Sequence, residues 1–80
     1  MIYNLNELYE EVQKNYETVK ESWISKNNPQ LLEGVSNNYH VFEVMAKNTN
    51  KLSLMQRQSL VEDMNKTNDY LKDIRKRANI

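Results

Sequence analysis

Residues 39–46 of this 80-residue chain are Tyr39-His40-Val41-Phe42-Glu43-Val44-Met45-Ala46. Their apolar residues spread beyond one face of a helix, because Val41, Val44 and Met45 widen the stripe that contains Phe42. The segments on either side, 5–23 and 60–78, each carry a single narrow apolar stripe. A middle element that is apolar on more than one side indicates the centre of a helical bundle.

The short length limits what can stabilise the chain. Eighty residues form one domain, which we place at 1–80, and a domain of this size buries only about 60% of its unfolded surface. Cysteine is absent, so the chain can form no disulfide and no thiolate metal site. We therefore expect stability to come from helix packing or from association of two copies.

The composition favours an all-α fold. The chain contains one glycine and one proline, which argues against a β structure rich in turns. The formal net charge is zero, but residues 1–43 hold seven acidic and three basic side chains, whereas residues 44–80 hold four and eight. No apolar run approaches the roughly 20 residues of a membrane span, and no secretory signal is recognisable. We therefore expect a cytoplasmic protein without a membrane partner.

The first helix is predicted at about 5–26. Its apolar residues alternate in steps of four and three, as in a helix-packing seam: Leu5, Tyr9, Val12, Tyr16, Val19 and Trp23. Asn4 and Glu7 have the spacing of a capping box, and Tyr3 and Leu8 have that of a hydrophobic staple. The Asn-Asn-Pro sequence at 27–29 ends the helix, because residues before proline avoid the α region.

The second helix is predicted at about 29–48. Asn28 is a suitable cap and Pro29 a suitable first residue. The main apolar stripe comprises Leu32, Val35, Tyr39, Phe42 and Ala46. Gly34 either permits close approach of another helix or marks a later helix start near Val35. The β-forming residues at 39–44 would also suit a strand, but no second strand is available to pair with it.

The third helix is predicted at about 53–77. A polar break at 48–51 precedes it, and Ser53 with Gln56 has the capping-box pattern. Its stripe comprises Leu60, Met64, Thr67, Leu71, Ile74 and Ala78. Three helices joined by short breaks predict a small antiparallel three-helix bundle. The alternative is a larger bundle completed by homodimerisation.

No motif indicates catalysis or a cofactor. The acidic residues of the first helix lie off its apolar stripe and therefore form a solvated face. His40 is the only histidine, so it lacks the partners of a metal site or an activated nucleophile. Gly34 alone cannot form a phosphate-binding loop. We predict a non-enzymatic protein with no catalytic, cofactor-binding or metal-binding residues.

The wide apolar stripe of the second predicted helix predicts a surface that binds another protein. One face of each helix in a three-helix bundle should stay in water, so a surplus of apolar residues there is expected to be covered. The predicted contacts are Tyr39, His40, Val41, Glu43, Val44 and Met45. The occupant is another protein or a second copy of the chain. A small regulator or inhibitor from a phage or mobile element fits, because twelve asparagines and eight lysines suggest an AT-rich genome.

DNA binding by a transcriptional regulator is the alternative hypothesis. The segment Ser53–Arg57 follows a turn, as a recognition helix does in a helix-turn-helix, and the third helix ends in basic residues. The predicted nucleic-acid contacts are Arg57, Lys72, Arg75, Lys76 and Arg77. Two facts weigh against this function. A net charge of zero lacks the general attraction to DNA, and cations at a helix C-terminus also stabilise the helix itself.

Overall fold

The structure, a computed structural model, describes residues 4–80 as a set of packed helices. These residues form four α-helices and two 3-10 turns: α1 (Leu5–Glu21), α2 (Trp23–Asn27), η1 (Pro29–Leu32), α3 (Glu33–Lys47), η2 (Thr49–Lys51) and α4 (Leu54–Ala78). The all-α prediction is confirmed. The number of helices in the described residues differs from the predicted three, because α2 is separate from α1.

The predicted helix at 5–26 is interrupted at Ser22. The backbone of Ser22 is extended, with φ −80° and ψ 163°, and both its amide and its hydroxyl donate to the carbonyl of Val19. A serine that bonds the local backbone in this way competes with continuation of the helix. Because of this break, the residues after Ser22 do not continue the faces of α1. As a result Trp23, predicted to extend the apolar stripe, is 57% exposed, and Ser25 is buried.

The predicted helix at 29–48 also has two parts. Pro29 opens the 3-10 turn η1, and α-helical geometry begins only at Glu33. The side chain of Asn28 does not cap the turn and instead donates back to a carbonyl of α2. Gly34 serves no close approach, because a Cβ placed there would meet no atom within 4 Å.

The predicted caps are formed in different degrees. Ser53 and Gln56 make a complete capping box at the start of α4, each side chain accepting a bond from the backbone amide of the other. At the start of α1 the side chain of Asn4 accepts a hydrogen bond from the amide of Asn6, whereas the predicted capping box pairs Asn4 with Glu7. Tyr3, which belongs to the predicted staple, lies outside the described residues.

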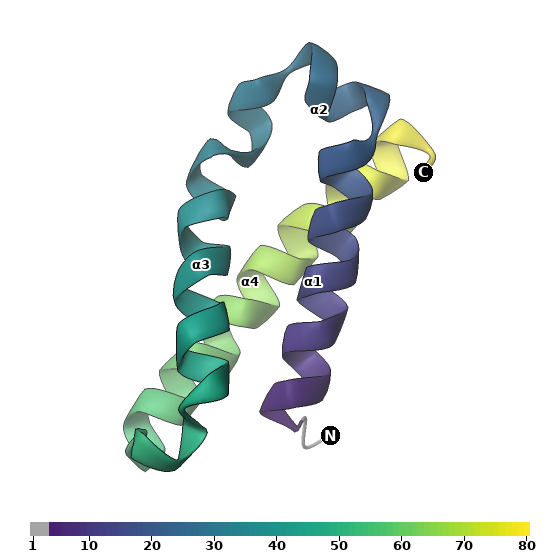
Figure 1. The fold of residues 1–80 in the computed structure, drawn as a ribbon. Coiled ribbons are helices and arrows are strands. Elements are labelled where there is room, and N and C mark those ends of the chain that lie inside the picture. Colours follow the sequence, from purple (N-terminus) through teal and green to yellow (C-terminus); the bar gives the residue numbers. More distant parts are fainter. Residues whose placement is uncertain (1–3) are drawn as a thin grey trace.

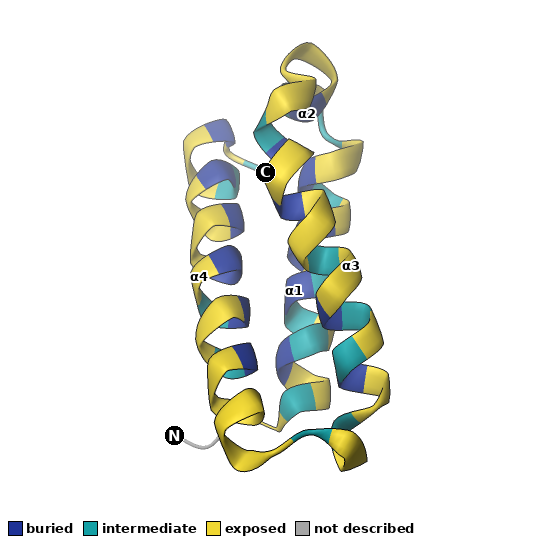
Figure 2. Cartoon of the chain, turned by 90° about the vertical axis from the view of Figure 1, so that its left-hand side faces the viewer, coloured by how far each residue is buried: buried dark blue, intermediate teal, exposed yellow. Residues whose placement is uncertain are grey.

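The packing of α1 against α4 forms the largest part of the fold. Both helices run from the lower to the upper end of the molecule in Figure 1, and α4 crosses α1. α3 runs in the opposite direction and contacts both. The buried residues of α4 form a stripe that faces the other helices (Figure 2). The core comprises Leu8, Val12, Tyr16, Val19, Leu32, Val35, Phe42, Ala46, Leu60, Met64, Leu71 and Ile74.

A chain of polar side chains crosses the contact between α1 and α4. The buried amide of Asn15 donates to the amide oxygen of Asn68 at 2.6 Å, and Asn68 donates to Glu11 at 3.0 Å. Arg75 donates to the oxygen of Asn15 at 2.6 Å, and Lys72 pairs with Glu11 at 2.9 Å. Buried amides are costly when they lack partners, so this network favours one register of the two helices.

Replacing Asn68 with leucine should destabilise the protein. The change leaves the buried amide of Asn15 without its acceptor, at a cost of about 1–3 kcal/mol. The double variant Asn15→Leu/Asn68→Leu removes both polar groups, so it should lose less stability than the two single variants together. Urea unfolding followed by circular dichroism measures all three. Strictly additive losses would contradict a direct coupling of the two amides.

Candidate protein-binding surface

The contact residues predicted on α3 lie on three sides of that helix. Tyr39 and Glu43 are half-buried on the side of α1, Val41 and Met45 face α4, and His40 and Val44 are exposed on the outer side. The structure therefore places Val41 and Met45 next to α4, whereas Val44 lies one turn from Val41 on the outer side of α3. The structure separates all three from Tyr39.

Tyr39 belongs to an aromatic stack between α1 and α3. Its ring centroid lies 4.5 Å from that of Tyr16 and 5.8 Å from that of Tyr9, and the planes differ by only 16° and 6°. The hydroxyl of Tyr9 donates to the hydroxyl of Tyr39 at 3.2 Å. Burial, together with this hydrogen bond, raises the pKa of the Tyr39 phenol above its ordinary value. Tyr39 thus helps to hold α3 against α1.

An apolar patch is uncovered where α3 meets α4. We define the α3–α4 patch as Val41, Val44, Met45 and Met55. The side chains of Val41, Val44 and Met55 are 53%, 58% and 78% exposed. Val41, Met45 and Met55 line a hollow of about 210 Å³, whose other walls include core residues of both helices. Polar side chains at its edge come from α4: Gln56, Ser59 and Asp63.

The start of α4 is uncovered on every side. All residues from 53 to 59 are exposed, including Leu54 at 73% and Met55 at 78%. Figure 2 shows this part of α4 at the lower end of the molecule, together with the turn that precedes it. Met55 was not among the predicted contacts, because it lies off the core stripe of its own helix. The Leu54-Met55 pair directly after the cap was the signal that could have identified it.

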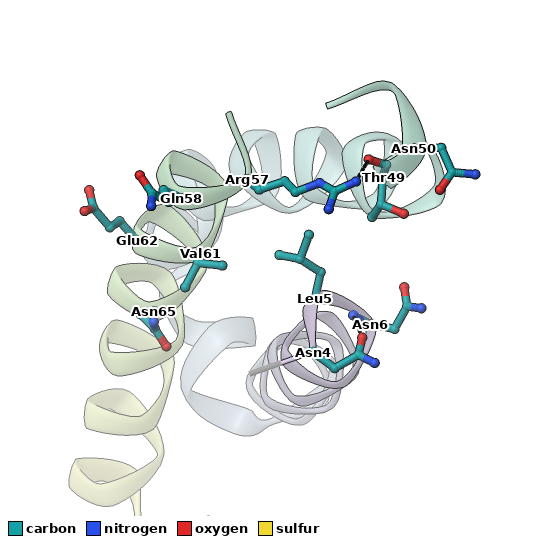
Figure 3. Close-up of a pocket in the computed structure, with 10 residues that line it drawn as sticks. All are labelled: Asn4, Leu5, Asn6, Thr49, Asn50, Arg57, Gln58, Val61, Glu62 and Asn65. Atoms are coloured by element: carbon teal, nitrogen blue, oxygen red, sulfur yellow. Dashed lines mark hydrogen bonds between the residues drawn. The ribbon is translucent and has the colours of Figure 1, made fainter. Parts of the chain in front are cut away.

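A wider hollow lies on the other side of the start of α4, next to the beginning of α1 and to η2 (Figure 3). Leu5 and Val61 approach it from α1 and α4, and Arg57 reaches across to donate to the carbonyl of Thr49 at 2.9 Å. Most of its remaining lining is amide side chains: Asn4, Asn6, Asn50, Gln58 and Asn65. Among the described residues that line it, only Arg57 and Glu62 are ionisable.

Most of the predicted nucleic-acid contacts are engaged within the chain. Four of the five bond to other groups of the protein: Arg57, Lys72, Arg75 and Arg77. Lys72 pairs with Glu11 at 2.9 Å, and Arg77 pairs with Asp73 at 3.1 Å. Lys76 is exposed near the end of α4. The paired carboxylates reduce the positive potential that a phosphate backbone would meet.

Residues 4–80 also bear on metal binding and on membrane insertion. In that range no three histidine, aspartate or glutamate side chains cluster so that they could hold a metal ion. His40 is exposed on the outer side of α3. No helix in the same range combines the length and the apolar character needed to cross a bilayer.

Acid should weaken the contact between α1 and α4 through Glu11. Hydrogen bonds from Lys72 and Asn68 hold the pKa of this carboxyl below its ordinary value of 4.5. Its stabilising effect is therefore complete above about pH 4.5 and is lost as the pH falls through the lowered pKa.

The urea midpoints of wild type and Glu11→Gln should consequently differ at about pH 7 and approach each other as the pH falls through the lowered pKa of Glu11. Glu10→Gln, at an exposed neighbouring position, is the control. A difference between wild type and Glu11→Gln that stays constant over this pH range would contradict the assigned role.

Comparison with known proteins gives no indication of function beyond the geometry described above. No protein-family model, no characterised protein and no solved structure matches the chain.

Proposed function

We propose that the protein is a small non-enzymatic binding module that uses the α3–α4 patch to occupy a site on another protein. The observation that supports this most is the exposure of Val41 and Met55, which line a hollow between two helices, and of Val44, one turn from Val41 on α3. Exposed apolar surface with a polar edge is typical of interaction sites. In this proposal the chain is a cytoplasmic regulator or inhibitor, and its composition fits an origin in a phage or mobile element.

The shape of the hollow favours a partner segment that inserts one apolar side chain. α3 and α4 supply its two walls, and the edge on α4 is polar. In such arrangements a few anchors at an apolar centre carry most of the binding energy, while the edge excludes water. Met45 and Met55 can adapt to the inserted group, because methionine is flexible and polarisable. His40 and Glu43 would then be outer contacts on α3.

A second copy of the chain is the alternative occupant of the patch, and it would complete the helical bundle. Each copy would cover the exposed apolar residues of the other, as expected of an isologous contact. In that arrangement the helices α1, α3 and α4 of each copy would form one half of the assembly.

DNA binding is the second candidate function. It is favoured by the exposure of the whole segment from Ser53 to Arg57, since a recognition helix needs a free N-terminal end. The internal pairing of the basic residues weighs against it. Binding to duplex DNA that weakens with rising salt, and that Lys76→Ala reduces, would support this candidate. No binding at low salt would eliminate it.

Replacing an apolar residue of the patch with glutamate should abolish partner binding and leave the fold intact. Val44→Glu and Met55→Glu change side chains that are already in water, so each should alter the free energy of unfolding by no more than about 0.5 kcal/mol. A photo-cross-linking residue at position 44 should capture a discrete partner in an extract of cells that make the protein. Met55→Glu should remove that adduct.

The same cross-linking residue at Lys14, on an exposed part of α1, is the matched control and should capture no discrete partner. Unfolding of Val44→Glu would show that this residue belongs to the core. Equal capture from positions 14 and 44 would show that the patch is not the binding surface.

A further inference from the structure

The aromatic stack between α1 and α3 brings the hydroxyl groups of two phenols together. The planes of Tyr9 and Tyr39 differ by 6°, the centroids are 5.8 Å apart, and the hydroxyl oxygens are 3.2 Å apart. Each hydroxyl carbon is flanked by two ortho carbons, so close hydroxyls bring ortho carbons of the two rings near each other. Both side chains are half-buried, which leaves them within reach of small solutes.

We propose that Tyr9 and Tyr39 form an oxidative modification site, at which a one-electron oxidant such as a peroxidase joins the two rings covalently. Loss of one electron and the hydroxyl proton from each phenol gives two phenoxyl radicals, with unpaired spin at the ortho carbons. One carbon–carbon bond forms between these carbons. Each ortho hydrogen then leaves as a proton and the ring oxygen takes one up, which restores both phenols. In total the oxidant gains two electrons, and two protons go to the solvent.

The neighbouring tyrosines are less suited to this reaction. Tyr16 stacks closer to Tyr39 at 4.5 Å, but it is only 7% exposed. The ammonium group of Lys20 also lies 6.0 Å from the centroid of Tyr16, and a positive charge there disfavours removal of an electron. The hydroxyl of Tyr70 is bonded to the carbonyl of Leu31, and within residues 4–80 no aromatic ring stacks on it.

The bond would tie α1 to α3 and close a loop in a chain that has no cysteine. The two tyrosines are 30 residues apart, so the link restricts the unfolded chain much as a disulfide would. Tyr39 lies on the α1 side of α3, away from the α3–α4 patch. The modified protein would therefore keep that patch open. This inference concerns a different surface and does not rest on the proposed function.

The test oxidises dilute protein with photogenerated tris(bipyridine)ruthenium(III) and persulfate. The Trp23→Phe background removes a competing exposed ring. We expect a monomeric product that has lost two hydrogen atoms and shows dityrosine fluorescence. Trypsin should release peptide 1–14 joined to peptide 27–47, and fragmentation should assign the link to Tyr9 and Tyr39. The thermal midpoint of the product should rise by more than about 10 °C.

Matched variants make the assignment specific. Tyr9→Phe and Tyr39→Phe keep the stacked rings but should lose the product, whereas Tyr16→Phe and Tyr70→Phe should retain it. Circular dichroism confirms that each variant is folded. Each of three results would overturn the proposal: a link from peptide 15–20, products that join separate chains, or an equal yield of the same link in concentrated urea.

Discussion

A buried pair of amides, Asn15 and Asn68, joins α1 to α4 at a separation of 53 residues along the chain. Apolar side chains alone would allow these two helices to slide or rotate against each other at modest cost. The amide pair removes that freedom, because a shifted register would leave donors and acceptors in the core without partners. α3 is then added to this framework through the tyrosine stack on one side and Phe42 in the core.

The elements that follow a regular apolar spacing were predicted well from the sequence. All six stripe residues predicted on α4 are buried: Leu60, Met64, Thr67, Leu71, Ile74 and Ala78. The break at Ser22 was not predicted, because it depends on bonds from one serine to the carbonyl of Val19 that compete with a favourable helical pattern. The buried amides were also missed, since a polar residue beside an apolar stripe is normally solvated.

The candidate site could be predicted only in part. The excess of apolar residues at Val41, Val44 and Met45 is visible in the sequence. Val41 and Met45 lie at the edge facing α4, and the exposed Val44 lies one turn from Val41. The sequence could not show that Tyr39 packs on α1 or that Met55 completes the patch. Residue spacing gives the angle of a side chain about its own helix. Which neighbouring helix packs against that side chain depends on how the helices cross.

The distance along the chain between α1 and α4 also affects how the protein emerges during synthesis. The apolar face of α1 has its main partner in α4, which is made after α2 and α3. At roughly 5–20 residues per second, that face waits several seconds while residues 22–78 are added. The unfinished chain therefore carries an uncovered amphipathic helix, which chaperones can bind. The contact between α1 and α4 can form only when Asn68 and the residues after it reach the earlier helix α1.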